Sequence, residues 1–303
     1  MIKQKEGSIF KIERYRLDDG PGIRTTVFLK GCPLRCYWCS NPESQNIYPE
    51  IMYNKSLCIK ECNECIKACL SSALKKDEEG KVRIDRQLCK RCNKCADVCC
   101  TKALINVGKN ITAEEVLREI KKDIPFYKAT GGGVTISGGE PLFQLEFTQE
   151  ILKGCKEKWG LHTVLDTSGY GNLGEILNYT DLVLYDIKLI DSVTHKEYTG
   201  KSNEIILKNL EEISKKSIPM IVRIPVIPGI NDSEKNIVEV VEILKGLQFM
   251  HVELLPYHRL GVNKYKMLGR EYKLKSTKQP TKTSLNIIRN LFISNNIECK
   301  IVI

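Results

Sequence analysis

"RTTVFLKGCPLRCYWCS", residues 24–40, joins a predicted strand directly to three closely spaced cysteines. Residues 24–30 are rich in β-branched side chains and are flanked by glycines, so they predict a β-strand. Cys32, Cys36 and Cys39 follow with the spacing C-x3-C-x2-C. Three thiolates suit zinc or an iron–sulfur cluster, but zinc would need a fourth ligand and no His lies nearby. The spacing therefore favours a four-iron cluster with one iron left open to another ligand.

The remainder of the chain alternates strands and helices. Further strands are expected at 133–137, 161–166, 181–188, 219–226 and 251–257, and helices at 112–123, 144–158, 173–179, 204–216, 233–246 and 281–295. Apolar strands separated by helices indicate a parallel sheet with helices outside. About six such units predict an α/β fold, a partial or full TIM-like (β/α)6 barrel, with its chemistry at the carboxyl ends of the strands.

A cysteine-rich repeat interrupts this alternation. "CIKECNECIKAC" begins at Cys58, and "CKRCNKCADVC" repeats its pattern from Cys89, 31 residues later. The duplication predicts a small insert at 49–108, between barrel segments at 1–48 and 109–303. In two-cluster bacterial ferredoxins the fourth cysteine of each run ligates the other cluster. That rule assigns one four-iron cluster to Cys58, Cys62, Cys65 and Cys99, and a second to Cys69, Cys89, Cys92 and Cys95.

Two departures from the ferredoxin pattern leave alternatives open. The first run begins C-x3-C instead of C-x2-C, and neither run has a proline after its last cysteine. Cys100 could replace Cys99 as a ligand. A zinc module is the other alternative, because duplicated cysteine-rich segments also bind zinc.

Polar residues gather where the predicted strands end. "SGGEP" brings Gly138, Gly139 and Glu140, and the later strand ends bring Asp166, Thr167, Ser168, Asp186, Ile187, Lys188, Arg223 and His258. Each alone could be a turn or a paired surface group, and for a lone His that is the commoner case. Charged side chains in apolar strands nevertheless need a partner. A zwitterionic ligand with a ribose would supply one.

Composition and charge limit the functional classes. The chain has 303 residues, 14 cysteines and a formal charge of +10. Its first residues lack a signal peptide and it has no long apolar run, so the cysteines predict metal sites in a reducing, cytoplasmic compartment. Residues 58–109 hold 12 Lys and Arg against 7 Asp and Glu. Two four-iron clusters of about −2 each would offset most of that excess, so we predict neither a nucleic-acid nor a membrane partner.

Taken together, the motifs resemble those of one family. "DDGPGIRTTVFLKGCPLRCYWCSNPE", the double-cluster insert, "GGGVTISGGEPL", "YDIK" and "ELLPYHRLG" are similar to the glycyl-radical-enzyme activating enzymes of the radical S-adenosylmethionine (SAM) superfamily. The resemblance covers nearly the whole chain. It points to the insert-bearing branch that serves diol dehydratases, choline lyase, hydroxyproline dehydratase, arylacetate decarboxylases and arylsuccinate synthases.

The resemblance implies a mechanism. SAM would chelate the open iron of the cluster on Cys32, Cys36 and Cys39, and reduction would release methionine and a 5′-deoxyadenosyl radical. That radical would remove hydrogen from a backbone glycine of a partner glycyl-radical enzyme, giving 5′-deoxyadenosine. With the insert, the enzyme would hold three four-iron clusters, and a low-potential donor such as flavodoxin or ferredoxin would reduce it.

The resemblance also implies roles for individual residues. Lys188 would join the three cysteines in the catalytic set, and Asp166 and Asp186 would hold a monovalent cation. The SAM contacts would be Trp38, Cys39, Ser40, Gly138, Gly139, Glu140, Asp166, Thr167, Ser168, Asp186, Ile187, Lys188, Arg223 and His258.

Two other functional classes explain fewer of these motifs. An electron-transfer protein with a scaffold barrel would leave the three-cysteine site and "SGGEP" without a role. A zinc-dependent nucleic-acid binder is favoured only by the charge.

Overall fold

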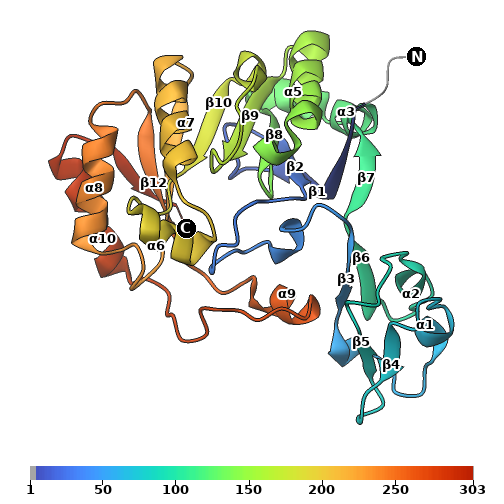
Figure 1. Cartoon of the computed structure of the whole chain (residues 1–303). Helices are drawn as coiled ribbons and strands as arrows, with labels where there is room; N and C mark the ends of the chain where they lie inside the picture. The colour runs from blue at the N-terminus through green and yellow to red at the C-terminus, as the bar shows by residue number, and fades with distance from the viewer. Residues whose placement is uncertain (1–4, 303) are drawn as a thin grey trace.

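A nine-stranded sheet forms the larger part of the computed structural model, which describes residues 5–302 (Figure 1). The strand order is β13-β12-β11-β10-β9-β8-β2-β1-β7, with β13 and β7 at its two ends. Seven neighbouring strands run parallel: β2 (Arg24–Leu29), β8 (Gly133–Gly138), β9 (His162–Thr167), β10 (Leu182–Asp186), β11 (Met220–Val226), β12 (His251–Pro256) and β13 (Cys299–Ile301). Their carboxyl ends therefore meet at one edge of the sheet. β1 (Glu6–Arg16) and β7 (Lys109–Thr112) extend the sheet in antiparallel pairing.

Helices cover the outer side of this sheet, as Figure 1 shows. They are α3 (Ala113–Lys121), α5 (Leu145–Trp159), α7 (Glu204–Lys215), α8 (Glu234–Leu244) and α10 (Lys282–Ser294). The Thr-x-x-Glu pattern at the start of α3 forms a capping box, in which Thr112 and Glu115 bond to each other's backbone amide. Val116 and Ile120 of α3 are fully buried in the core with Val27 of β2. Burial of such apolar faces is the main force that holds helices on a sheet.

The opposite face is filled at the amino ends of the strands. Arg24 is fully buried there, and its guanidinium donates to Thr135 Oγ1 at 2.7 Å and to the carbonyl of Val134 at 2.6 Å. Burial lowers the pKa of Arg24 to about 10. A small apolar cluster that includes Val164 and Leu184 lies on the neighbouring strands. The amino end is thus packed, which leaves the carboxyl end for a cavity.

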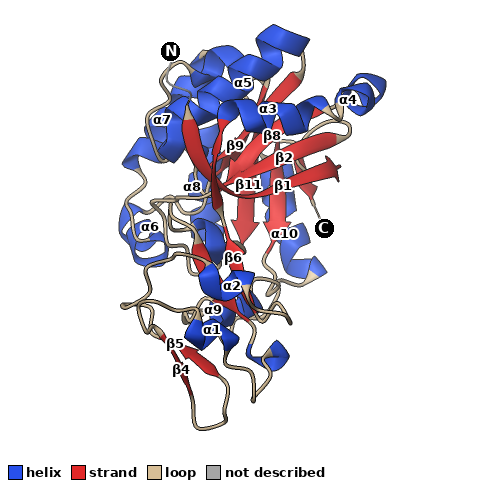
Figure 2. Ribbon diagram, turned by 90° about the vertical axis from the view of Figure 1, so that its right-hand side faces the viewer, coloured by secondary structure: helices blue, strands red, loops and turns tan. Residues whose placement is uncertain are grey.

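The cysteine repeat folds as a small unit of its own, at the lower right of Figure 1. It contains two antiparallel pairs, β3 (Glu50–Tyr53) with β6 (Leu104–Val107) and β4 (Leu74–Lys76) with β5 (Val82–Ile84). Helices α1 (Glu64–Lys67) and α2 (Lys94–Asp97) occupy equivalent places in the two repeats. Its core contains Ile51, Leu74, Val82, Ala96 and Leu104. Figure 2 shows β4, β5, α1 and α2 below the large sheet.

Ion pairs and hydrogen bonds fasten the insert to the rest of the chain. Glu50 lies at the start of β3, and its carboxylate is 2.6 Å from Arg270 and 3.7 Å from the buried ammonium of Lys30. Arg86 donates to the carbonyl of Met267, at the end of α9 (Val262–Met267), at 3.0 Å. The insert is therefore held against α9 and against the segment that leads into the cysteines.

The six parallel strands predicted between residues 24 and 257 are confirmed as β2 and β8 to β12. Six elements were not predicted from the sequence: β1, β7, β13, α4 (Ile124–Thr130), α6 (Ser192–Thr199) and α9. The helix expected at 173–179 is a 3-10 turn, Ile176–Tyr179. Further 3-10 turns are Pro42–Ser44, Lys55–Leu57 and Pro141–Gln144. No helix within residues 5–302 combines the length and hydropathy that crossing a membrane requires.

Candidate active site at the carboxyl edge of the sheet

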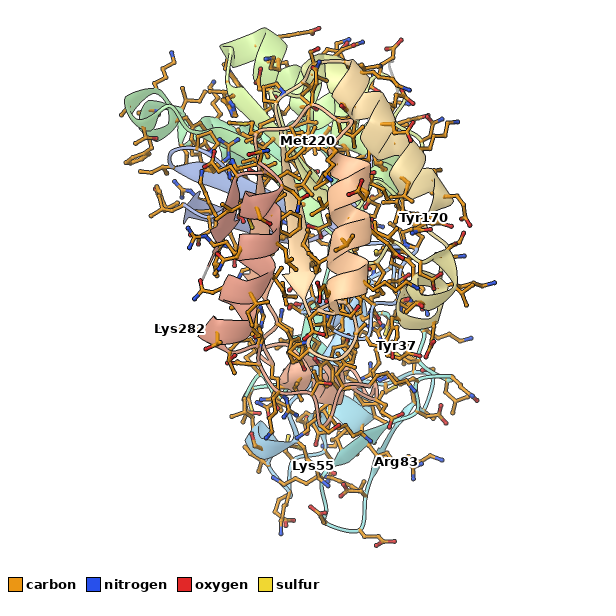
Figure 3. All side chains as sticks on the ribbon, turned by 90° about the vertical axis from the view of Figure 1, so that its left-hand side faces the viewer. Tyr37, Lys55, Arg83, Tyr170, Met220 and Lys282 are labelled. Carbon is orange, nitrogen blue, oxygen red and sulfur yellow. The ribbon has the colours of Figure 1, made fainter. Side chains whose placement is uncertain are left out.

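The loop after β2 carries Cys32, Cys36 and Cys39, all partly buried. Its backbone is tied to the end of α6, because Arg35 donates to the carbonyl of Thr199 at 2.6 Å and Tyr37 donates to that of Tyr198 at 3.0 Å. Figure 3 shows Tyr37 between Met220, at the amino end of β11, and Lys55 and Arg83 in the insert. The cysteines thus lie at the edge of the sheet that faces the insert.

Trp38 anchors this loop from the other side. Its ring is buried in an apolar cluster with Leu189, Ile227, Tyr257 and Tyr265. Burial raises the pKa of all three cysteine thiols, that of Cys36 to about 12. Thiols in such surroundings need a bound metal to become thiolates.

A cavity of about 310 Å³ opens beside the three cysteines. This volume lies in the range of small-molecule sites, roughly 300–1,000 Å³. The cysteine loop forms one wall, and the carboxyl ends of β8, β9 and β10 form the other. The predicted site residues that line it are Cys32, Cys36, Trp38, Cys39, Ser40, Gly138, Gly139, Asp166, Thr167, Ser168, Asp186 and Lys188.

Close backbone packing requires glycine at both glycine positions of "SGGEP", and the sequence did not reveal this. A Cβ on Gly139 would lie 2.2 Å from the carbonyl oxygen of Gly31, and a Cβ on Gly138 would lie 2.2 Å from the amide of Leu29. Gly139 itself donates to the carbonyl of Leu29 at 2.8 Å. The glycines therefore let the backbone of β8 pack against the start of the cysteine loop.

Glu140 lies behind the cavity wall. It is buried, and its carboxylate accepts from the hydroxyl of Thr167, from the amide of Ser168 at 2.9 Å and from the hydroxyl of Ser168 at 2.5 Å. Burial raises the pKa of Glu140, although these hydrogen bonds act in the opposite direction. Glu140 thus orients two residues that do line the cavity.

Opposite charges alternate along the strand ends. Lys188 Nζ donates to Asp186 Oδ2 at 2.9 Å, and Arg223 lies 4.0 Å from Asp166. Burial and the neighbouring Asp186 raise the pKa of Asp166, while Arg223 opposes that rise. For Lys188, burial lowers the pKa, but Asp186 and the Cys36 thiol more than compensate and the net shift is upward. The cavity can therefore offer a cation and a carboxylate to a zwitterionic ligand.

Three further predicted residues do not line the cavity. Ile187 is buried, and Arg223 is buried with its guanidinium on Glu253 at 2.9 Å and on the carbonyl of Asp18 at 3.0 Å. His258 is exposed in the loop after β12. The sequence missed the lining residues Leu34, Asn41, Ser44, Gln45, Ser137, Pro225 and Leu255. Most of them belong to no distinctive motif, but Ser137 could have been found, because it is the first residue of "SGGEP". It lies in β8, and its hydroxyl donates to Asp166 at 2.6 Å.

The insert contains two cysteine-lined hollows. The outer hollow is lined by Tyr53 and by Cys58, Cys62, Cys65, Cys99 and Cys100. The inner hollow is lined by Ile51 and by Cys69, Cys89, Cys92 and Cys95. Within residues 5–302, no group of three or more His, Cys, Asp or Glu side chains is placed to share a single metal ion. The insert cysteines are instead grouped by the two hollows that they line.

Known proteins resemble this chain over most of its length. A sequence profile of the radical SAM superfamily matches residues 87–241, and one of a 4Fe-4S single cluster domain matches residues 18–74. The isethionate sulfite-lyase activating enzyme of Nitratidesulfovibrio vulgaris is 44% identical over 89% of this chain and 90% of that protein. The trans-4-hydroxy-L-proline dehydratase activating enzyme of Clostridioides difficile is 41% identical over 97% of this chain and 98% of that protein.

A solved structure shares the fold. The crystal structure of a radical SAM methyltransferase from Sphaerobacter thermophilus aligns with 99% of this chain and 77% of its own, at a TM-score of 0.56 and 13% identity.

Fold, cysteine loop and profile together define a radical SAM enzyme. Within that superfamily, the chain belongs to the glycyl-radical-enzyme activating enzymes. It is thus an enzyme that activates glycyl-radical enzymes and uses SAM and an iron–sulfur cluster. The family expected from the sequence motifs is confirmed.

Proposed function

We propose that the cavity at the carboxyl edge binds SAM against a four-iron cluster held by Cys32, Cys36 and Cys39. The observation that carries this proposal is the shared cavity, because it joins three thiols to polar residues from three strand ends. The donor set fits the group: three soft thiols can hold a cluster and leave one iron open. When bound, the reduced cluster and SAM supply the radical that removes hydrogen from a glycine of the partner enzyme.

The residues around the cavity orient the ligand and exclude water. Lys188 offers its ammonium to the carboxylate of SAM, and Asp166 and Asp186 face the cationic groups. Ser137, Thr167 and Ser168 supply hydroxyls from neighbouring strand ends. The same two aspartates are the proposed holders of a monovalent cation. His258 is left out of this set, because it is exposed and does not line the cavity.

For the whole chain we propose a partial (β/α)6 barrel, residues 1–48 and 109–303, with a ferredoxin-like insert at 49–108. The sheet order, with β13 and β7 at opposite ends, supports a partial barrel. The two hollows support two four-iron clusters, one on Cys58, Cys62, Cys65 and Cys99 and one on Cys69, Cys89, Cys92 and Cys95. With the cluster on the loop, the enzyme would contain three.

Cys99 is preferred to Cys100 as the ligand in the outer hollow. The Cys99 sulfur accepts from the amide of Leu104 at 3.4 Å and lies 3.7 Å from the hydroxyl of Thr101. Cys69, its equivalent in the first repeat, likewise lies 3.6 Å from the hydroxyl of Ser71. Cys100 is exposed. Hydrogen-bond donors that point at a sulfur stabilise its thiolate. Because Cys69 makes the same contact in the first repeat, this contact favours Cys99 over Cys100 as the ligand.

One short segment of chain contacts all three cysteine sites. Gln45 lines the SAM cavity, Ile51 lines the inner hollow and Tyr53 lines the outer one. Between them, Tyr48 stacks on the guanidinium of Arg91, a residue of the inner hollow, at 3.9 Å. We infer an order of electron transfer in which a low-potential donor such as flavodoxin or ferredoxin reduces the outer cluster first.

The central test is anaerobic reconstitution of Cys36→Ala beside the wild-type protein. Wild type should bind about twelve irons and cleave SAM when reduced. The variant should bind about eight and cleave none, because two thiolates hold the loop cluster poorly. Electron paramagnetic resonance should still detect the two insert clusters in the variant. Full SAM cleavage by the variant would show that the loop cysteines do not hold the reactive cluster.

A further inference from the structure

The two cysteine-lined hollows of the insert are related by the sequence repeat, but their linings are not identical. Tyr53 lines the outer hollow, and Ile84 lines the inner hollow at the equivalent place. We propose that the Tyr53 hydroxyl donates a hydrogen bond to the thiolate of Cys58 when the outer hollow holds its cluster, and that this bond makes the cluster easier to reduce. The inference rests on the proposed function, because it takes the outer hollow to be a cluster site.

The repeat and the strand pairing show that these two positions correspond. Tyr53 and Ile84 each lie five residues before the first cysteine of their repeat. Tyr53 ends β3 and pairs with Leu104, whereas Ile84 ends β5 and pairs with Leu74. The two leucines are themselves equivalent in the repeat, and they line the same two hollows. One place in the fold therefore holds a hydroxyl in one repeat and a hydrocarbon in the other.

The hydroxyl oxygen of Tyr53 is buried, and no hydrogen-bond partner for it lies within residues 5–302. Burial raises the pKa of this hydroxyl, and the neighbouring thiol of Cys58 raises it further. The proton therefore stays on the oxygen and is available for donation. A buried hydroxyl without a partner is costly. An acceptor sulfur in the hollow would remove that cost.

Cys58 becomes such an acceptor when it binds a metal. As a free thiol, it points its sulfur at the carbonyl of Ile59 at 3.8 Å. The thiolate is the form that ligates metals, and it carries no proton to donate. Hydrogen bonds to the sulfurs of an iron–sulfur cluster help to set its reduction potential. Reduction adds negative charge to these sulfurs, so the bond from Tyr53 strengthens and stabilises the reduced form.

Other polar groups around the hollows do not replace this hydroxyl. Each hollow has one cysteine beside a hydroxyl that follows it in sequence, Ser71 in the inner hollow and Thr101 in the outer one. These two contacts are equivalent and favour neither cluster. The inner hollow is also lined by Lys90 and Arg91, whose charges act on the inner cluster. The effect of Tyr53 is therefore measured on the outer cluster alone.

Redox titration of reconstituted Cys36→Ala, followed by electron paramagnetic resonance, reports the two insert clusters without the loop cluster. A second protein that also carries Cys99→Ala lacks the outer cluster and so identifies its signal by difference. When Tyr53→Phe is added to Cys36→Ala, the ratio of oxidised to reduced outer cluster at a given potential should rise about tenfold. That change is equivalent to a shift of about 59 mV to lower potential for a one-electron couple. The inner cluster should not shift.

Tyr48→Phe is the matched control in the same Cys36→Ala protein. It removes a hydroxyl from the same segment of chain, but the ring of Tyr48 stacks on Arg91 and is absent from the described lining of the outer hollow. Neither cluster should shift in this variant. Tyr53→3-fluorotyrosine keeps the shape of the side chain and makes its hydroxyl a stronger donor. It should shift the outer cluster in the opposite direction from Tyr53→Phe.

Two outcomes would overturn the proposal: an outer potential that neither Tyr53 variant changes, or an equal shift of both clusters. Iron analysis comes first, because about eight irons per chain in Cys36→Ala are expected if both insert clusters are present. A failure of the proposed function thus appears as missing iron. A failure of this inference appears as an unchanged potential in a protein with its full iron content.

Discussion

Lys188 is the cation of the proposed SAM cavity, and it is largely buried there beside Asp186. Its raised pKa keeps the ammonium charged. Lys188→Ala should therefore weaken SAM binding by roughly tenfold or more, since a hydrogen bond to a charged group contributes about 1.5–3 kcal/mol. Iron content should not change, because Lys188 is no cluster ligand. Equilibrium dialysis with labelled SAM measures the affinity.

Lys156→Ala is the matched control for that experiment. Lys156 also pairs with an aspartate, Asp181, at 2.5 Å, but that pair is absent from the cavity lining. SAM affinity should be normal in this variant. Equal affinities for wild type and Lys188→Ala would place the ligand elsewhere.

Neighbouring cysteines offer a second comparison at this scale. Cys99→Ala should lose about four irons per chain, because the outer cluster loses one of its ligands and the binding energy that this ligand contributes. Cys100→Ala should keep them. Iron and sulfide analysis after identical reconstitution measures the difference, and the reverse result would make Cys100 the ligand.

Among the elements, β8 and the cysteine loop depend on each other through Gly139. Gly139→Ala would bring a methyl group to 2.2 Å from the carbonyl oxygen of Gly31, so the backbone must move. We expect the loop cluster to be lost and the two insert clusters to remain, with the melting temperature lowered by several degrees. Gly246→Ala is the control, since nothing lies near its Cβ position. Reconstitution of all clusters in Gly139→Ala would contradict this account.

The main elements could be predicted because their sequences repeat one pattern. β2 and β8 to β12 are apolar segments followed by helices, and that alternation indicates a parallel sheet. β1 could not be found in this way. Its side chains are mostly partly or fully exposed, and its regular pairing is broken near Phe10 and between Glu13 and Arg16. α9 is short and mostly polar, and its position depends on contacts with distant residues such as Asn41.

The residues that line the cavity could be predicted where polar residues follow strands. Residues in the loops were harder to place. Asp166, Asp186 and Lys188 could be placed because the carboxyl ends of parallel strands share one edge. No comparable sequence pattern shows which way a loop side chain points. His258 follows β12 just as Lys188 follows β10, yet it points to solvent. Glu140 is part of a motif, but its hydrogen bonds to Thr167 and Ser168 turn it away from the cavity.

For the whole molecule, the question is how electrons reach the proposed SAM cavity. If the insert is a relay, Cys92→Ala should lose one insert cluster and slow activation of a glycyl-radical enzyme by a protein donor. Cleavage of SAM driven by a strong chemical reductant should fall less, because a small reductant can reach the loop cluster directly. The glycyl radical formed with each donor is counted by electron paramagnetic resonance.

Other roles of the insert give different patterns in the same experiment. A bracing role predicts that both activities decline together with the melting temperature, because cluster binding is then folding energy. A role in docking alone predicts an equal loss of glycyl radical with either donor at unchanged stability. That last result would exclude the relay.

The ion pair between Lys30 and Glu50 also limits how this architecture could have been assembled. Lys30 is fully buried and follows β2 of the large sheet, whereas Glu50 begins β3 of the cysteine-rich unit. Lys30 Nζ also donates to the carbonyl of Glu43, so without the unit its ammonium would keep a neutral acceptor and lose its carboxylate partner. Loss of one partner of a buried ion pair is destabilising. Gain or loss of the unit during evolution would thus favour a compensating change at residue 30, which makes the unit a component on which the large sheet depends.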